Sequence, residues 1–362
     1  MTVTSNQYSV ISQAELAAWL DALARTTTLI APYKMADILL YQPVQSSREI
    51  AWDFGRPVMS AKEFFFPPSE RLLLIEKGAG GVKLTETIHE GKQVIFGARP
   101  CDAHGVKLLD ALFLDKPPVD HYYANRRANT ALIGLACKEM GAACFCTSVG
   151  GAPDDAHNMD VMLYPVDGGY AVEAVTEKGK SLISDLRFTN ADYTRQTSIA
   201  NRKSPTLAPG ASAGVVNPQS SIVNPQSINW PAHFDDEYWA RTSERCLSCR
   251  ACAYVCPTCR CFAVRDEYLP VEAAGCGPGC TQYERIRSWD SCEGENYRRT
   301  AGGHRPRAEK SQRLRNRYFC KFYFYPDQYG LGNASACTGC GRCVDICPVN
   351  VDITEVITDL AR

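Results

Sequence analysis

Two runs of cysteines in the C-terminal third of the sequence have the spacing of metal ligands. Each follows the pattern C-x2-C-x2-C-x3-C-P, within a stretch too short to bury much of itself. The first run contains Cys246, Cys249, Cys252 and Cys256, and the second contains Cys337, Cys340, Cys343 and Cys347. Three thiolates on one tight loop can bind three irons of a cubane [4Fe–4S] cluster, while the fourth ligand usually comes from elsewhere in the chain.

The presence of two complete runs indicates that they exchange their last ligands. In ferredoxins with two clusters, the final cysteine of each run binds the cluster of the other run. We therefore expect a first [4Fe–4S] cluster on Cys246, Cys249, Cys252 and Cys347. A second cluster is expected on Cys337, Cys340, Cys343 and Cys256. Zinc fits less well, because structural zinc sites use four ligands in total, and disulfides between such close thiols would strain their loops.

Cysteines in the N-terminal half are candidates for a third cluster. Cys101 follows an expected strand at the start of a helix, Cys137 ends the next strand, and Cys144 and Cys146 come soon after. The ends of adjacent strands in an α/β domain commonly face one crevice, so we expect these thiols to converge. Backbone N–H groups at the helix start would favour a thiolate at Cys101. The alternative is a set of ordinary buried thiols, because free cysteine is often buried.

The other cysteines of the 18 in the chain have no assigned role: Cys259, Cys261, Cys276, Cys280, Cys292 and Cys320. Two interpretations stay open for them, because they could shield the clusters or bind another metal. The sequence assigns no catalytic residue, and His104, His157 and His304 are expected to be structural. Neither a G-x-G-x-x-G nor a Walker motif is present, so a nucleotide site is not supported.

A strongly basic segment covers residues 298–321. It carries Arg298, Arg299, Arg305, Arg307, Lys310, Arg313, Arg315, Arg317 and Lys321 against Glu309 alone. We favour a solvated or partner-docking face, because the aromatic and groove-reading motifs of nucleic-acid binding are absent. The weaker alternative is that these charges tune the anionic clusters.

The whole composition describes an ordinary globular protein with an excess of cysteine. The 362 residues are 45% hydrophobic and 22% charged, with a net charge of −1, which suggests neither nucleic acid nor anionic lipid as a partner. The sequence contains no run of 18 apolar residues, so we expect no membrane span. The N-terminus lacks the pattern of a secretory signal. Many cysteines in metal-ligand spacing indicate a reducing compartment, so we expect a cytoplasmic protein.

The elements that must position these cysteines begin with a mixed α/β domain, expected over residues 1–193. A capping-box pattern at Ser12 and Glu15 precedes a helix over 12–24. A second helix is expected over 102–113, with Asp102 as its cap. Apolar segments indicate strands at 37–44, 71–76, 92–98 and 130–137, and an Asp-Gly pair indicates a hairpin over 161–175.

The rest of the chain divides into a linker and a metal-binding domain. Residues 194–230 are rich in Pro, Ser and Asn and repeat the sequence VNPQS, so we expect a flexible linker. Residues 231–362 contain few strand patterns, and helix-compatible segments flank their cysteines. The expected fold is therefore α+β: an N-terminal mixed α/β domain, then a mainly helical ferredoxin-like domain with two clusters.

The cysteine segments and their surroundings resemble a known family. CLSCRACAYVCPTCRCF (246–262), RSWDSCEGENYRRTAGGHRPR (287–307) and CTGCGRCVDICPVNVDI (337–353) resemble the β subunit of cytoplasmic sulfhydrogenases, the NAD(P)-linked [NiFe] hydrogenases. They are also similar to the A subunit of anaerobic sulfite reductase. The segments at 57–73, 97–110 and 144–153 share the resemblance. It implies an electron-transfer subunit with [4Fe–4S] clusters, which works beside a catalytic subunit, often together with a flavin subunit.

We therefore expect an iron–sulfur subunit of a soluble multi-subunit oxidoreductase, distinct from its catalytic subunit. It would carry two or three clusters and connect a hydrogenase-like catalytic subunit to a flavin or ferredoxin partner. One alternative is a terminal reductase subunit that uses polysulfide or sulfite. Another is a protein whose clusters only stiffen the fold.

Overall fold

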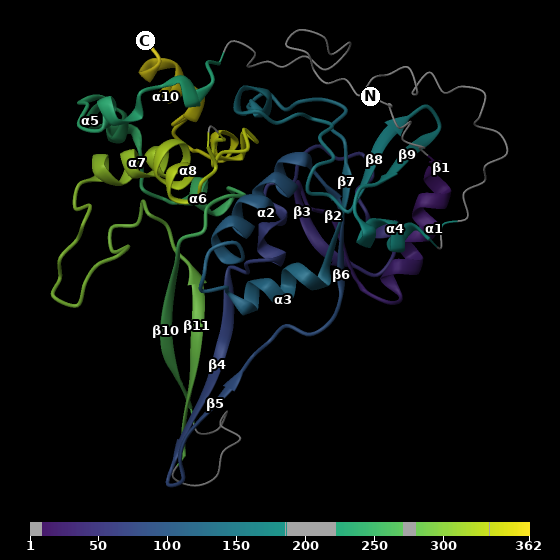
Figure 1. Cartoon of the computed structure of the whole chain (residues 1–362), viewed down its shortest axis with the longest axis horizontal. Coiled ribbons are helices and arrows are strands. Elements are labelled where there is room, and N and C mark those ends of the chain that lie inside the picture. Colours follow the sequence, from purple (N-terminus) through teal and green to yellow (C-terminus); the bar gives the residue numbers. More distant parts are fainter. Residues whose placement is uncertain (1–8, 185, 187–221, 271–279, 333) are drawn as a thin grey trace.

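Two β-sheets and a set of short helices form the protein (Figure 1). The computed structural model describes residues 9–184, 186, 222–270, 280–332 and 334–362. The larger sheet has the strand order β1-β9-β8-β7-β6-β2-β3, and the smaller has the order β10-β11-β4-β5. No helix within the described part of the chain combines the length and apolar content needed to cross a membrane.

The larger sheet is parallel at its centre and antiparallel at its edges. Its strands are β1 (Ser9–Ser12), β2 (Thr28–Met35), β3 (Ile38–Val44), β6 (Gln93–Ala98), β7 (Thr130–Leu135), β8 (Val161–Val166) and β9 (Gly169–Ala174). Strands β2, β6, β7 and β8 pair in parallel. Every residue of β6 and β7 is buried, as expected for central strands that are covered on both faces.

Helices cover both faces of this sheet. They are α1 (Gln13–Ala24), α2 (Pro100–Phe113), α3 (His121–Asn129) and α4 (Glu177–Ile183). Helix α1 packs Leu16 and Leu20 on one face, and α2 packs Val106 and Leu109 on the other. The predicted capping box of α1 is present, since the Ser12 hydroxyl accepts a hydrogen bond from the Glu15 N–H at 3.2 Å.

Helix α2 begins differently from the prediction. Its N-cap is Arg99, and Asp102 lies at the third helical position. The Asp102 carboxylate accepts a hydrogen bond from the Arg99 N–H at 3.3 Å. This places Asp102 one turn inside the helix, where its side chain is available to a different partner.

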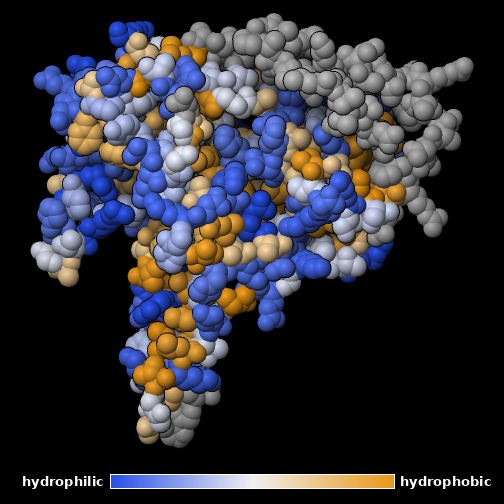
Figure 2. Space-filling model, viewed as in Figure 1, coloured by the Kyte–Doolittle hydropathy of each residue, from blue (hydrophilic) through white to orange (hydrophobic). Residues whose placement is uncertain are grey.

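The smaller sheet is an antiparallel arm that projects from the body (Figure 1). It consists of β4 (Ser69–Gly78), β5 (Gly81–Glu86), β10 (Phe262–Leu269) and β11 (Thr281–Trp289). Apolar side chains are exposed along it, including Val82, Leu84, Val264 and Tyr268 (Figure 2). The pairing of β11 with β4 joins the two predicted domains, and a buried ion pair between Arg287 and Glu70 reinforces the junction.

The cysteine-rich part contains short helices and the hairpin β10–β11. Its helices are α5 (Tyr238–Arg245), α6 (Ala251–Tyr254), α7 (Lys310–Phe319), α8 (Tyr325–Gln328), α9 (Arg342–Asp345) and α10 (Ile353–Leu360). A π-helical turn, Cys320–Phe324, connects α7 with α8. Because the long hairpin belongs to residues 231–362, the expected mainly helical character of this domain is not confirmed.

The last residues of the predicted linker are packed into the cysteine-rich part. Residues 187–221 lie outside the described chain, so the linker prediction stays untested there. From residue 222 onward, Ile222, Ile228 and Trp230 are buried in one core with Phe319 and Phe322. The predicted linker therefore extends too far, because its final apolar residues contribute to this core.

We expect Trp230→Ala to lower the free energy of unfolding by about 3–5 kcal/mol. The indole stacks on Phe322 with ring centroids 4.9 Å apart, and its Nε1 donates a hydrogen bond to the Pro225 carbonyl at 2.8 Å. Anaerobic urea unfolding followed by circular dichroism measures the change. Trp230→Phe keeps most of the buried area and should lose about 1 kcal/mol. Equal losses in both variants would contradict the packing explanation.

Candidate metal centres

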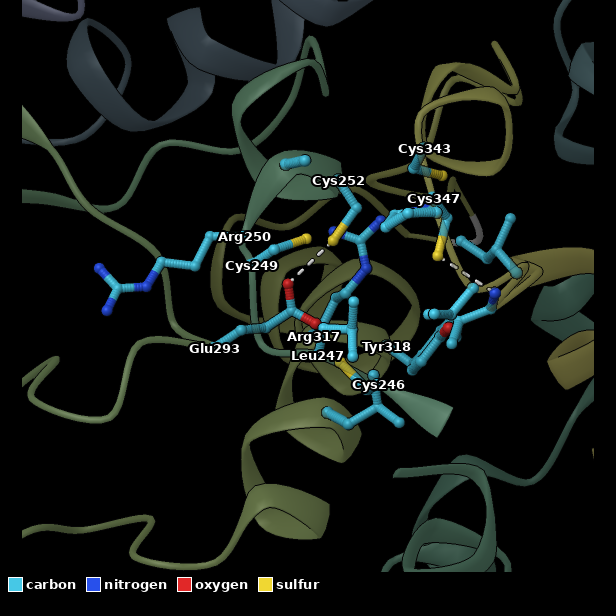
Figure 3. Close-up of a pocket in the computed structure, with 16 residues that line it drawn as sticks. Cys246, Leu247, Cys249, Arg250, Cys252, Glu293, Arg317, Tyr318, Cys343 and Cys347 are labelled. Carbon is cyan, nitrogen blue, oxygen red and sulfur yellow. Dashed lines mark hydrogen bonds between the residues drawn. The ribbon is translucent and has the colours of Figure 1, made fainter. Parts of the chain in front are cut away.

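Cysteines from both runs line one pocket between α6, α7 and the C-terminal segment (Figure 3). They include the thiols predicted for the first cluster, Cys246, Cys249, Cys252 and Cys347, which we call site 1. Cys343 lines the pocket as well. Cys249 and the neighbouring Leu247 are exposed, so site 1 lies close to the protein surface.

A buried cation in site 1 suits an anionic cluster. Arg317 of α7 lines the pocket and is 4% exposed, and its Nη1 has no hydrogen-bond partner among the described residues. A buried N–H donor without an acceptor is costly. Four thiolates bound to a [4Fe–4S] cluster would leave net negative charge beside this guanidinium. The donor set and the unsatisfied Arg317 atom therefore fit such a group.

Glu293 is a residue of this pocket that the sequence did not single out. It lies in the loop after β11, is buried, and accepts a hydrogen bond from the Cys252 thiol at 3.0 Å. Burial raises the pKa of the Cys252 thiol well above its usual range. Metal ligation requires the thiolate, so cluster binding here would release this proton and break the hydrogen bond.

The two cysteine runs share one backbone turn. In the first run, Ser248 and Arg250 have φ values of 53° and 67°, and in the second Gly339 and Gly341 have 61° and 73°. The N–H at the first of these positions donates to the sulfur of the leading cysteine in each run. Non-glycine residues seldom adopt positive φ, so the strain in the first run indicates a conformation required by its ligands.

The predicted ligands of the second cluster, Cys256, Cys337, Cys340 and Cys343, also lie together, and we call them site 2. Burial raises the pKa of Cys337 to about 12 and that of Cys343 to about 11, with smaller effects from neighbouring thiols. Lys321 reaches the Cys256 sulfur with its ammonium group at 3.1 Å. Cys256 and Lys321 are both buried, so this contact places a cation beside a predicted ligand sulfur inside the protein.

Part of the basic segment is buried, and two of its residues, Arg317 and Lys321, face these sites. Arg313, Arg317 and Lys321 recur every four residues along α7 and the turn that follows, and all three are buried. A spacing of four places side chains on one face of a helix. The favoured interpretation of a solvated face is therefore wrong for these three residues, and this spacing was the sequence signal that could have identified them.

The cysteines proposed for a third cluster, Cys101, Cys137, Cys144 and Cys146, gather at the ends of β6 and β7 as expected, and we call them site 3. Burial raises the pKa of Cys146 to about 12, and the nearby Cys137 and Cys144 thiols add to the shift. Burial also raises the pKa of Cys101 well above its usual range. Burial therefore opposes the stabilisation of a Cys101 thiolate that is expected at the helix start.

Sites 2 and 3 are in direct contact through glycine backbone. The Phe145 N–H donates to the Gly339 carbonyl at 2.8 Å, and the Cys144 thiol donates to the Cys340 carbonyl at 3.6 Å. A Cβ on Gly339 would lie 2.5 Å from the Cys146 backbone. Glycine is therefore required at this turn by its positive φ and by the close approach of the two segments.

A buried ion pair fixes the same junction. Arg342 of α9 pairs with Asp102 of α2 at 2.9 Å, and their side chains are 1% and 0% exposed. The Arg342 Nη1 also lies 3.8 Å from the Cys101 sulfur, and its Nε donates to the Pro57 carbonyl at 2.9 Å. Asp102 thus connects the two halves of the chain, in addition to its hydrogen bond with the Arg99 N–H at the start of its own helix.

Most of the remaining cysteines form another group. Cys259, Cys261, Cys292 and Cys320 lie close to one another beside site 2. Cys280 is disulfide-bonded, and Cys276 lies outside the described residues. No three His, Cys, Asp or Glu side chains in the described ranges are placed to hold a single metal ion.

Comparison with known proteins identifies the class to which this chain belongs. Residues 245–351 match the family described as a 4Fe-4S dicluster domain, so the chain is an iron–sulfur protein. The chain is also 30% identical over 343 residues to sulfhydrogenase 2 subunit beta of Pyrococcus furiosus, covering 94% of each sequence. The chain therefore belongs to the sulfhydrogenase β-subunit family. No solved structure matches it significantly.

Proposed function

We propose that the chain is the iron–sulfur electron-transfer subunit of a cytoplasmic, multi-subunit oxidoreductase. Its partners would be a flavin or ferredoxin protein and a hydrogenase-type catalytic subunit. Sites 1 and 2 would each hold a [4Fe–4S] cluster with exchanged final cysteines, and site 3 would hold a third. Bound clusters would supply reversible one-electron redox centres. The homology to a hydrogenase subunit supports the partner class.

The observation that carries the proposal is the continuity of the three sites. Cys343 of site 2 lines the pocket of site 1, and Cys340 of site 2 accepts a hydrogen bond from Cys144 of site 3. The three ligand sets therefore form a continuous row, in which site 2 contacts both site 1 and site 3. One end reaches the surface at Cys249 and Leu247, where a partner can approach.

The protein supplies charge balance along this row. Arg317 lies in site 1, Lys321 contacts site 2, and Arg56 lies 3.5 Å from the Cys144 sulfur of site 3. Cations close to a cluster stabilise its more negative, reduced form and raise its reduction potential. The positions of these side chains thus suit centres that accept and return electrons.

Anaerobic purification of the native complex tests the function directly. We expect the chain to be isolated with a [NiFe] hydrogenase-type subunit, and its visible absorption to bleach when hydrogen is supplied to the complex. The alternative is a terminal reductase subunit for polysulfide or sulfite. Turnover of those compounds by the isolated chain, without partners, would favour the alternative.

For site 3, we expect Cys137→Ala and Cys146→Ala in the full chain each to lose about four irons and four sulfides relative to wild type. The full chain is required, because residues 1–193 alone would leave β4 without its partner β11. Ser148→Ala, in the same turn as Cys146, is the control and should keep its iron. Unchanged iron in both cysteine variants would show that these thiols are ordinary buried residues.

A further inference from the structure

Outside the three sites, one more set of thiols comes together from three separate segments of the chain. Cys259 and Cys261 follow the first cysteine run, Cys292 follows β11, and Cys320 follows α7. The Cys292 thiol interacts electrostatically with the thiols of Cys259, Cys261 and Cys320. Cys292 is buried and the others are half-buried. Residues far apart in the sequence thus present four sulfurs to one region.

Cys261 and Cys292 are neighbours in this group. The Cys261 thiol interacts with the Cys292 thiol and with the Tyr297 hydroxyl. The Asp290 N–H donates to the Cys261 carbonyl at 2.9 Å, which fixes the two loops together. A backbone contact between their loops therefore holds these two cysteines side by side.

The other two thiols, Cys259 and Cys320, lie beside cationic side chains. Arg260 Nη2 lies 3.3 Å from the Cys320 sulfur, and its guanidinium also interacts with the Cys259 and Cys261 thiols. Lys321 lies 3.7 Å from the Cys259 sulfur. Two cations therefore lie beside Cys259 and Cys320, and no three of these thiols are placed to hold a single ion such as zinc within the described residues.

Buried Lys62 adds a charge that the group can balance. It is 2% exposed and donates to the carbonyls of Cys259 and Tyr254 at 3.1 and 3.2 Å. No carboxylate forms an ion pair with it among the described residues. A buried ammonium without an anion is costly, and an anionic centre beside Cys259 would offset that cost.

From this geometry we propose that Cys259, Cys261, Cys292 and Cys320 form site 4 and ligate a further [4Fe–4S] cluster. Each thiol loses its proton to solvent as its sulfur bonds one iron, with no change in oxidation state. Site 4 adjoins site 2, because Lys321 contacts both Cys256 and Cys259. Site 2 would then adjoin sites 1, 3 and 4. Electrons could leave the protein at a second place, beside the base of the arm.

Two single variants of the anaerobically purified full chain test the proposal. Cys292→Ala and Cys320→Ala remove thiols on different segments, yet each should lose about four irons and four sulfides and the same paramagnetic signal of the reduced protein. Ser288→Ala is the control. Ser288 lies on β11, where its hydroxyl accepts a hydrogen bond from Arg265 at 2.7 Å, so its removal should leave iron content and spectra unchanged.

Other outcomes would overturn the proposal. Full iron content and unchanged spectra in both variants would do so, as would one zinc per chain in wild type that both variants lose while keeping their iron. Far-UV circular dichroism shows whether each variant folds. If one of them does not, Cys261→Ser is tested in its place. The metal count does not depend on the proposed electron-transfer role. A negative result for site 4 would therefore not contradict the proposed function, and the reverse also holds.

Discussion

Replacement of Cys347 by alanine is expected to remove the cluster of the first cysteine run, although Cys347 lies in the second. Cys347 lines the same pocket as Cys246, Cys249 and Cys252. Its sulfur accepts a hydrogen bond from the Val351 N–H at 3.2 Å, which holds the side chain in that position. We expect a loss of about four irons per chain, because a cubane with three remaining thiolates lacks the ligand for one corner.

Paramagnetic resonance of the reduced protein distinguishes the exchange from its alternative. Cys347→Ala and Cys249→Ala should remove the same signal, whereas Cys337→Ala should remove another. Cys337 serves as the matched control because it belongs to the same run as Cys347 but lies in site 2. If Cys347→Ala and Cys337→Ala removed one common signal, each run would hold its own cluster.

The sequence predicted the elements whose patterns are local. The helix at 12–24 and the strands at 92–98 and 130–137 correspond to α1, β6 and β7, because continuous apolar segments and a capping box need no distant partner. Strand β2 was missed, although it is central to the larger sheet. The β10–β11 hairpin was also missed, since β10 is mostly exposed and the hairpin depends on the pairing of β11 with β4.

Site residues were predictable where their chemistry imposes a spacing. The two cysteine runs are short motifs, and the convergence of Cys101 with Cys137 follows from parallel strand ends. The surrounding charges were not predictable in the same way. Lys62, Glu293 and Arg342 come from segments far apart in the sequence, and only the folded chain brings them beside the thiols.

Replacement of Arg342 by leucine is expected to lower the free energy of unfolding by about 3–5 kcal/mol, because it leaves the Asp102 carboxylate buried without its charged partner. Tyr41 would still donate a hydrogen bond to Asp102 at 3.0 Å, but a neutral hydroxyl cannot balance the charge. Arg342→Lys should be intermediate, since an ammonium keeps the charge but cannot reproduce the contacts with Asp102 and Pro57 together.

A double variant separates the cost of the unpaired charge from the loss of packing. Asp102→Asn with Arg342→Leu removes both charges, so it should be more stable than Arg342→Leu alone. Arg245→Leu is the control, because its ion pair with Glu355 is exposed and should contribute less than about 1 kcal/mol. Anaerobic urea unfolding measures all four proteins against wild type. A double variant less stable than Arg342→Leu would show that hydrogen bonding and packing at this junction, and not charge balance, hold the two halves of the chain together.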